Sequence, residues 1–184
     1  KKCGRKNNKR EQLTSAKALL KNSKEVNEFR PLYHKIYKLD DTFQLLDGFT
    51  AIILKDMIEG LELNTVEGAY MDCREIINSC NPTGYEYEEV KIEMTELEQK
   101  AIELKKNKGG TIPTELQVHV NNLYFNPVYL LRAIKILGTE GVTAYAHCSE
   151  SKQPIYFKSE LGEAIVLPIR PPEKVTDDEE ANNG

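Results

Sequence analysis

The 184-residue chain lacks tryptophan and holds only three histidines and four cysteines. The cysteines (Cys3, Cys73, Cys80 and Cys148) form no C-x-x-C pair, and their spacing fits no zinc motif. No apolar run approaches the roughly 18 residues of a membrane-spanning helix, and no apolar stretch follows the basic first residues as it does in a secretory signal. We therefore expect a cytoplasmic protein with reduced thiols, no metal, no cofactor and no membrane partner.

The motifs of common enzyme classes are also missing. The sequence contains no G-x-S-x-G, Walker loop, H-E-x-x-H or paired-carboxylate motif. The residues that could supply a base or a thiol nucleophile are His34, His119, His147 and Cys148. His147 and Cys148 are adjacent, and adjacent strand residues point to opposite faces, so they make a poor dyad. We expect a protein without catalytic residues, and an enzyme is the less favoured alternative.

Charge is unevenly distributed along the chain. The formal net charge is -4, but residues 1–30 contain ten Lys and Arg residues and only three Glu residues. Such asymmetry predicts a basic surface on an otherwise acidic protein, which suits loose binding of nucleic acid. The alternative from charge alone is a basic tail without a specific function.

The N-terminal part of the chain predicts one basic amphipathic helix. We expect a disordered basic tail at 1–9 and a helix at 10–24, whose buried stripe has the i, i+3, i+7 spacing of Leu13, Ala16 and Leu20. The basic side chains share a separate face and are Arg10, Lys17, Lys21 and Lys24. The predicted helix therefore has one apolar face and one continuous basic face.

Short strands are expected after this helix. Alternating residues predict a strand at 33–39, and the turn signal of Asp40-Asp41 is followed by a second strand at 42–46. A short β-branched apolar run predicts a strand at 51–54, and a further strand is expected at 61–66. Residues 69–79 are compatible with either a helix or a strand.

Residues 83–112 differ from the rest and resemble an insert. They are highly charged, and Thr95 and Glu98 have the spacing of a capping box. We expect a solvated helix at 95–107, ended by Gly109-Gly110. The insert would connect two halves, at about 10–80 and 113–172.

The second half repeats the order of the first. A strand is expected at 116–120, followed by a helix with Asn126 as N-cap and Pro127 in its first turn. The expected core stripe of this helix is Leu130, Leu131, Ile134 and Leu137, with Gly138 at its end. Strands are then predicted at 142–147, 154–158 and 163–169, before a disordered acidic tail at 173–184. The fold class is α+β, with two similar halves and two helices packed on one side of antiparallel sheets.

Four segments resemble the bacterial sliding-clamp family, the β subunit of DNA polymerase III. Residues 125–131 match a Phe-Asn-x-x-Tyr-Leu-Leu signature of that family. Residues 152–155 are similar to its Pro-containing strand turn, and 166–170 are similar to its hydrophobic-Pro-x-Arg strand. Residues 46–51 share only the Asp-Gly pair of a further turn. The segments follow one another in the family's order.

The resemblance implies a single DNA-clamp-like domain, 10–172, made of two βαβββ-type halves. In the family, the helices face the channel of a ring and present basic side chains to DNA phosphates. The candidates for DNA binding are Arg10, Lys17, Lys21, Lys24, Arg132 and Lys135. Each could equally be a solvated residue on an exposed helix face.

The family also binds short peptides from polymerases and clamp loaders in a hydrophobic cleft. The residues that match its motifs are Asp47, Gly48, Phe49, Leu167, Pro168, Ile169 and Arg170. In the family this cleft draws on two adjoining domains. The alternative is that the residues around Leu167 simply form the last core strand.

The expected function is that of a sliding-clamp-like processivity factor, an accessory protein of DNA replication in a bacterium or phage. It would bind double-stranded DNA without sequence specificity and tether a polymerase or other partner. A clamp ring needs six such domains, so this chain could close one only as a homo-oligomer. The alternative is a clamp-fold protein-interaction module without a DNA function, in which the insert and Tyr85 and Tyr87 serve a partner.

Overall fold

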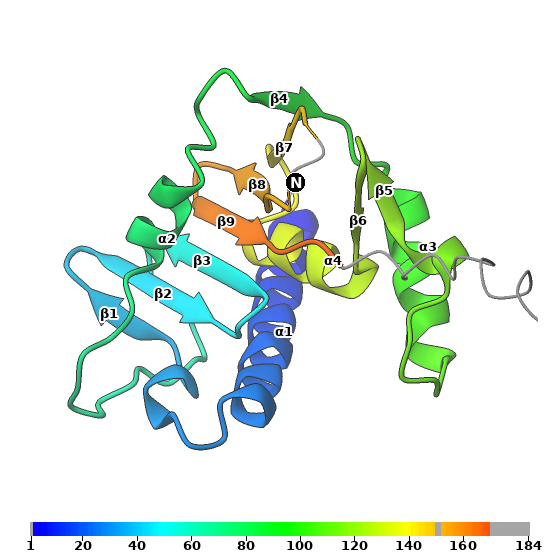
Figure 1. The fold of residues 1–184 in the computed structure, drawn as a ribbon. Coiled ribbons are helices and arrows are strands. Elements are labelled where there is room, and N and C mark those ends of the chain that lie inside the picture. The colour runs from blue at the N-terminus through cyan, green and yellow to red at the C-terminus, as the bar shows by residue number, and fades with distance from the viewer. Residues whose placement is uncertain (1, 150–151, 170–184) are drawn as a thin grey trace, which may run out of the picture.

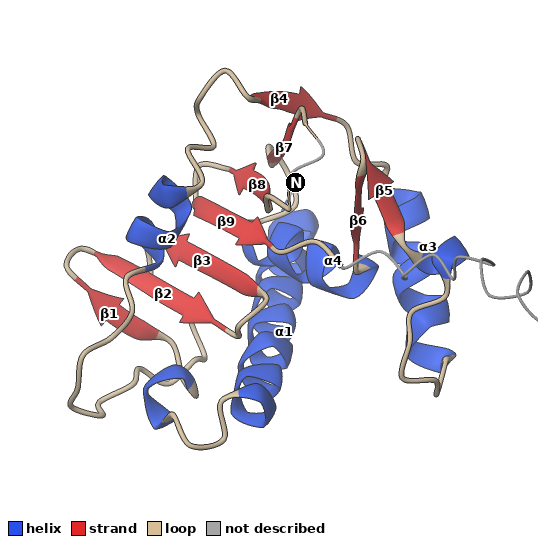
Figure 2. Ribbon diagram, in the orientation of Figure 1, coloured by secondary structure: helices blue, strands red, loops and turns tan. Residues whose placement is uncertain are grey.

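The computed structural model describes residues 2–149 and 152–169, with side chains described from Asn8 onward. The helices are α1 (Lys2–Val26), α2 (Cys73–Ser79), α3 (Met94–Lys106) and α4 (Pro127–Ile136). The strands are β1 (Tyr37–Leu39), β2 (Thr42–Leu46), β3 (Thr50–Leu54), β4 (Tyr87–Val90), β5 (Val118–Val120), β6 (Leu123–Phe125), β7 (Thr143–His147), β8 (Ile155–Lys158) and β9 (Gly162–Val166). The chain is therefore α+β, as predicted (Figure 2). Arg170 and the acidic tail predicted at 173–184 lie outside the described residues.

Seven strands form one antiparallel sheet in the order β1-β2-β3-β9-β8-β7-β4. Its centre is the pairing of β3 with β9, in which Ile52 lies opposite Ala164. Each strand of this pair is the last strand of a three-stranded meander that follows a helix: α1 precedes β1-β2-β3, and α4 precedes β7-β8-β9. β4 extends the sheet beyond β7 and has no counterpart next to β1. Each predicted half thus contains a helix followed by three strands, but within the described residues no strand precedes α1, so the predicted βαβββ order is incomplete in the first half.

Helices cover both faces of this sheet. α1 and α4 pack against each other and against one face, while α2 packs on β2 and β3 from the other face (Figure 1). The side chains of β3 alternate accordingly: Ile52 and Leu54 belong to the core under α1 and α4, whereas Ala51 and Ile53 belong to the core under α2. Two helices cover one side of the sheet, as predicted, but the sequence did not predict that α2 covers the other side and gives the sheet a second core. This also explains why β3 is buried throughout.

α1 is longer than the sequence indicates. It begins at Lys2, so residues 2–9 are helical and the prediction of a disordered tail is wrong for them. The buried stripe of the helix includes Ala16, Leu19 and Leu20, which pack on the sheet. Once these residues hold a helix, adding further turns requires no new nucleation, and lysine and arginine tolerate the helical backbone well.

The segment 83–112 is built into the fold and is no mere connector. β4 forms an edge of the main sheet, paired with β7. α3 packs on α4 and buries Leu97 and Ala101. The predicted helix exists, but its N-cap is Glu93 and has no capping side chain, so the capping box expected from Thr95 is not formed. The prediction of a solvated helix is therefore wrong for the face of α3 that buries Leu97 and Ala101.

Other boundaries also differ from expectation. β1 covers only the end of the strand predicted at 33–39, because Pro31 starts a 3-10 turn (Pro31–Tyr33). The strand predicted at 61–66 makes only an isolated bridge between Leu63 and Ile36. The ambiguous segment 69–79 contains α2, whose N-cap Asp72 accepts a hydrogen bond from the backbone of Arg74. The strand predicted at 163–169 ends at Val166.

The start of α4 agrees with the sequence in detail. The side chain of Asn126 accepts a hydrogen bond from the backbone N–H of Val128 at 2.9 Å, and Pro127 occupies the first turn. The helix packs against α1, α3, β3 and β9. This cap fixes where the helix enters the core, and it therefore positions the side chains along α4 that face α1.

The described cysteine thiols differ in burial, and we therefore expect them to differ in how fast they react. Cys73 is completely buried, which raises its pKa to about 11, and burial also raises the pKa of the half-buried Cys80. Cys148 is exposed. Because the thiolate is the reactive form, we expect native-state alkylation by iodoacetamide to be fastest at Cys148, slower at Cys80 and absent at Cys73 until unfolding. Peptide mass spectrometry measures these rates; modification of Cys73 as fast as that of Cys148 would contradict the buried position of α2.

Candidate nucleic-acid interface

Four of the predicted DNA-binding residues form an exposed basic stripe on α1. Arg10, Lys17, Lys21 and Lys24 are all solvent-exposed. Among the described residues, none of these four makes an ion pair within 4.0 Å. The stripe therefore presents four cations that no described carboxylate neutralises at short range.

The opposite face of α1 is anchored in the fold, which gives the stripe a fixed direction. Ser23 is fully buried, and its hydroxyl donates to the carbonyl oxygens of Tyr33 and Leu46 at 2.7 and 2.8 Å. Asn22 donates to the carboxylate of Asp47 at 2.8 Å. These bonds hold the C-terminal half of the helix against β2 and the segment before β1.

The two predicted DNA-binding residues on α4 have different surroundings. Lys135 is half-buried, with its Nζ 4.0 Å from Glu11 and 3.9 Å from Glu98. Arg132 is also half-buried and lies over the ring of Tyr129, at 5.7 Å. Burial lowers the pKa of the Arg132 guanidinium, an effect opposed by the nearby charge of Asp47. These two cations are thus held within the fold, unlike the stripe.

A further face of α1, next to the basic stripe, carries Glu11, Ala18 and Glu25, which recur every seven residues. Its two glutamates separate the stripe from α4. Glu11 and Ala18 line a groove together with residues of α4. The six predicted DNA-binding residues therefore do not form one continuous surface: four belong to the stripe, and Arg132 and Lys135 belong to this groove, with Arg10 at the border of both.

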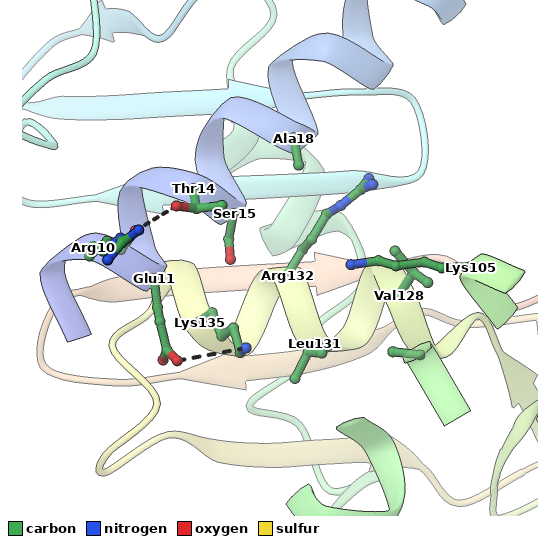
Figure 3. Close-up of a pocket in the computed structure, with 11 residues that line it drawn as sticks. Arg10, Glu11, Thr14, Ser15, Ala18, Lys105, Val128, Leu131, Arg132 and Lys135 are labelled. Atoms are coloured by element: carbon green, nitrogen blue, oxygen red, sulfur yellow. Dashed lines mark hydrogen bonds and ion pairs between the residues drawn. The ribbon is translucent and has the colours of Figure 1, made fainter. Parts of the chain in front are cut away.

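The groove has a volume of about 490 Å³ and runs between α1, α3 and α4 (Figure 3). Its cationic side chains come from all three helices and are Arg10, Lys105, Arg132 and Lys135. Lys105 was not singled out from the sequence, because its proximity to α4 depends on how α3 packs. Glu11 also lines the groove and, like Glu98, lies within 4.0 Å of the ammonium group of Lys135.

The residues predicted to border a peptide pocket divide into two groups. Asp47 is fully buried: its carboxylate accepts hydrogen bonds from Asn22 and from the backbone N–H groups of Phe49 and Thr50, at 2.7 to 2.9 Å. It therefore closes the turn between β2 and β3, with Gly48 at a positive φ of 91°. The prediction that Asp47 borders an open pocket is wrong, since its oxygen atoms are already engaged inside the protein.

Phe49 and Leu167 form an exposed apolar patch next to this turn. The backbone N–H of Leu167 donates to the carbonyl of Phe49 at 2.9 Å, and the two side chains are 40% and 42% exposed. Phe49 stacks on Tyr129 at 5.4 Å, and a Cβ at Gly48 would lie 3.3 Å from the exposed Val26. The sequence reasoning missed Tyr129 and Val26, because only the fold brings α1 and α4 to this turn.

Pro168 and Ile169 are half-buried beyond the end of β9. The backbone N–H of Ile169 donates to the carbonyl of Tyr124 in β6 at 2.7 Å, so this segment ties β6 to the sheet. Of the predicted pocket residues, Phe49 and Leu167 therefore contribute an exposed surface, whereas Asp47 belongs to a structural turn and Arg170 lies outside the described residues.

The histidine and cysteine considered for catalysis point apart. His147 is buried and Cys148 is exposed. The Nδ1 atom of His147 accepts from the backbone N–H of Ser149 at 3.2 Å and lies 2.9 Å from its hydroxyl, while Nε2 lies 3.4 Å from Glu86. With Nδ1 as acceptor, Nε2 bears the proton and donates toward Glu86. These contacts hold the turn after β7 against the segment before β4.

Within the described part of the chain, no three His, Cys, Asp or Glu side chains gather into a metal site. None of the helices in these residues combines the length and the hydrophobicity of a membrane span. Comparison of the chain with protein-family models, with curated proteins and with solved structures finds no match.

Proposed function

We propose that this chain is a DNA-clamp-like protein that binds duplex DNA without sequence specificity through the basic stripe of α1. The observation behind the proposal is that four long cationic side chains share one exposed helix face without a short-range carboxylate partner. Such side chains contact phosphates, which position a protein on DNA but transmit no base identity. In this proposal the protein binds DNA and has no enzymatic activity.

The arrangement of the two halves supports this proposal. α1 and α4 lie side by side on one face of a sheet in which each helix is followed by three antiparallel strands, β1-β2-β3 and β7-β8-β9. In the sliding-clamp family that residues 125–131 resemble, paired helices of this kind face the DNA. We assign the DNA contact to α1, because α3 packs on α4 and its neighbours hold Lys135 among carboxylates.

The proposed role is that of a cytoplasmic replication accessory factor. The exposed patch of Val26, Phe49 and Leu167 would hold a peptide of a polymerase or loader, and several copies would have to associate to encircle DNA. Light scattering after size exclusion measures the assembly. A mass near six chains supports a closed ring, and a monomer removes the self-assembled ring from the proposal.

An interaction module without a DNA function is the second candidate. Tyr85 is 94% exposed and Phe29 is 90% exposed, which favours partner contacts at two loops. Tyr87 does not contribute to such a surface, because it is buried and its hydroxyl donates to the carbonyl of Pro154 at 2.9 Å.

Replacement of Lys17, Lys21 and Lys24 by glutamine separates the two candidates. For a DNA-binding stripe, we expect the affinity for a short duplex to fall, and the slope of log K against log salt to drop by about 0.9 per cation that had contacted a phosphate. Fluorescence anisotropy of a labelled duplex across a salt series measures both quantities.

The matched control replaces Lys38, Lys108 and Lys158, which are exposed and lie outside α1. It removes the same charge, so we expect a much smaller change in slope. Equal slopes for the two triple variants, or a wild-type chain that does not bind the duplex at low salt, would rule out the stripe as the DNA-binding surface and favour the interaction module.

A further inference from the structure

The basic stripe of α1 is a helix face whose charges lack partners among the described residues. Lys17, Lys21 and Lys24 are exposed, and no described carboxylate pairs with them within 4.0 Å. Glu62 lies near enough for the charge of Lys24 to help lower its pKa, but the larger cause is Lys35, with which Glu62 pairs at 2.6 Å. The three lysines therefore have no carboxylate of their own in the described fold.

The sequence supplies a run of carboxylates outside the described residues. Glu173 and Lys174 cancel in charge, and four acidic residues then follow without interruption at 177–180. Four residues of an extended chain cover about 10 Å, and the rise of a helix over the seven residues from Lys17 to Lys24 is also about 10 Å. The run and the stripe thus have opposite charges and about equal lengths.

The described chain leaves the fold near the C-terminal end of α1. The backbone N–H of Leu167 donates to the carbonyl of Phe49 at 2.9 Å. A Cβ at Gly48, one residue before Phe49, would lie 3.3 Å from the side chain of Val26, the last residue of α1. Ile169, two residues after Leu167, is the last described residue. The segment that carries the acidic run therefore starts close to the helix that carries the stripe.

This segment is long enough to reach the stripe. Glu180 follows Ile169 by a stretch of chain that, fully extended, spans at most about 36–40 Å. Along the helix axis, Lys17 lies about 14 Å from Val26, and a helix with its side chains is about 10–12 Å wide. The acidic run can therefore pass round the end of α1 and lie along the three lysines.

We propose that the acidic run 177–180 docks on Lys17, Lys21 and Lys24 of the same chain. A single exposed ion pair is weak and is screened by salt, so the contact depends on several pairs that form together. The covalent connection favours this, because it keeps the run at a high effective concentration near the stripe. The consequence for DNA rests on the proposed function: the docked run competes with phosphates for the lysines and weakens duplex binding at low salt.

Zero-length crosslinking of the full chain tests the contact without DNA. A carbodiimide activates a carboxylate, and a lysine amine in contact with it displaces the activating group and forms an amide. At low salt, we expect peptide mass spectrometry to find residues 177–180 joined to the stripe lysines severalfold more often than to the control lysines. The control lysines, which are exposed and lie outside α1, are Lys38, Lys108 and Lys158. In about 1 M salt, where the Debye length is about 3 Å, this preference should disappear.

A mixture of isotope-labelled and unlabelled chains distinguishes docking within one chain from docking between chains. We expect each crosslinked pair of peptides to carry a single label. Crosslinks spread evenly over stripe and control lysines, or pairs that combine both labels as often as one, would overturn the proposal.

Neutralising the run tests the competition with DNA. We expect the variant with Asp177→Asn, Asp178→Asn, Glu179→Gln and Glu180→Gln to bind the short duplex severalfold more tightly at low salt. The gain should shrink as salt rises, because salt screens the contact between the run and the stripe. The matched control replaces four exposed carboxylates elsewhere by glutamine, namely Glu88, Glu89, Glu115 and Glu140. It changes the net charge equally and should raise the affinity much less.

The two measurements separate this inference from the proposed function. Selective crosslinks in a chain that binds no duplex would support the contact and refute the DNA-binding function. Duplex binding through the stripe, without selective crosslinks and with unchanged affinity after neutralisation of the run, would refute the contact and leave the function standing. In a chain with glutamine at Lys17, Lys21 and Lys24, neutralising the run should add no more than the control does, because the two sets of substitutions remove the same interaction.

Discussion

Replacing Gly162 with alanine is expected to lower the free energy of unfolding by about 3 kcal/mol. Gly162 lies opposite Leu54 at one end of the β3–β9 pairing. A Cβ atom there would run into the backbone carbonyl of Ile53, far inside van der Waals contact. A backbone group cannot rotate away as a side chain does, so the strands must separate locally. Urea denaturation followed by circular dichroism measures the loss.

Gly110 provides the matched control for this substitution. A Cβ at Gly110 meets no atom within 4 Å. We expect Gly110→Ala to change the free energy of unfolding by no more than about 0.5 kcal/mol. Equal stability of wild type and Gly162→Ala would show that the two strands do not pair in this register.

Alanine at Ile52 and at Ile53 should each lower the free energy of unfolding by about 2–5 kcal/mol. Both side chains are at most 2% exposed, although they point to opposite faces of β3. Ile52 packs in the core beneath α1 and α4, and Ile53 packs in the core beneath α2. Each truncation therefore leaves a cavity in a different core. Chemical denaturation of the two single variants measures the losses.

Ile102→Ala is the control, because Ile102 is 56% exposed on α3. It should have a small effect. If Ile53→Ala were as mild as Ile102→Ala, α2 would not cover that face and the sheet would have a single core. A large effect at Ile53 with none at Ile52 would instead contradict the packing of α1 and α4.

Much of the fold could be predicted wherever local chemistry decides it. Asn126 and Pro127 marked the start of α4, because a capping side chain and a proline favour that position in any context. The turn signal of Asp40-Asp41 placed the following strand, β2, correctly. β4 and β6 were missed. β4 is short and carries two glutamates, and it is stabilised by the distant strand β7. β6 has only three residues, too few for a periodic pattern, and it is stabilised by β5 and by a bridge to the distant Ile169.

In the candidate site too, features set by local sequence were predictable, and features set by contacts between distant segments were not. The exposed stripe of Lys17, Lys21 and Lys24 follows from helical periodicity alone. The enclosure of Arg132 does not, because it depends on Tyr129 and on the approach of α1 to α4. The buried role of Asp47 was also not predictable from its Asp-Gly sequence, since Asn22 reaches it from another element.

The central position of the β3–β9 pair determines when the fold can form. β3 comes from the first third of the chain and β9 from the end of the described residues, so their pairing closes a very long loop. During synthesis, the strand with Ile52 and Ile53 remains an open sheet edge until Gly162 and the residues after it have left the ribosome. Neither half can complete its sheet as an independent folding unit, and we expect folding to be slow, because such distant contacts are costly to form. Until then, the unpaired edge of β3 is the part of the nascent chain most exposed to aggregation.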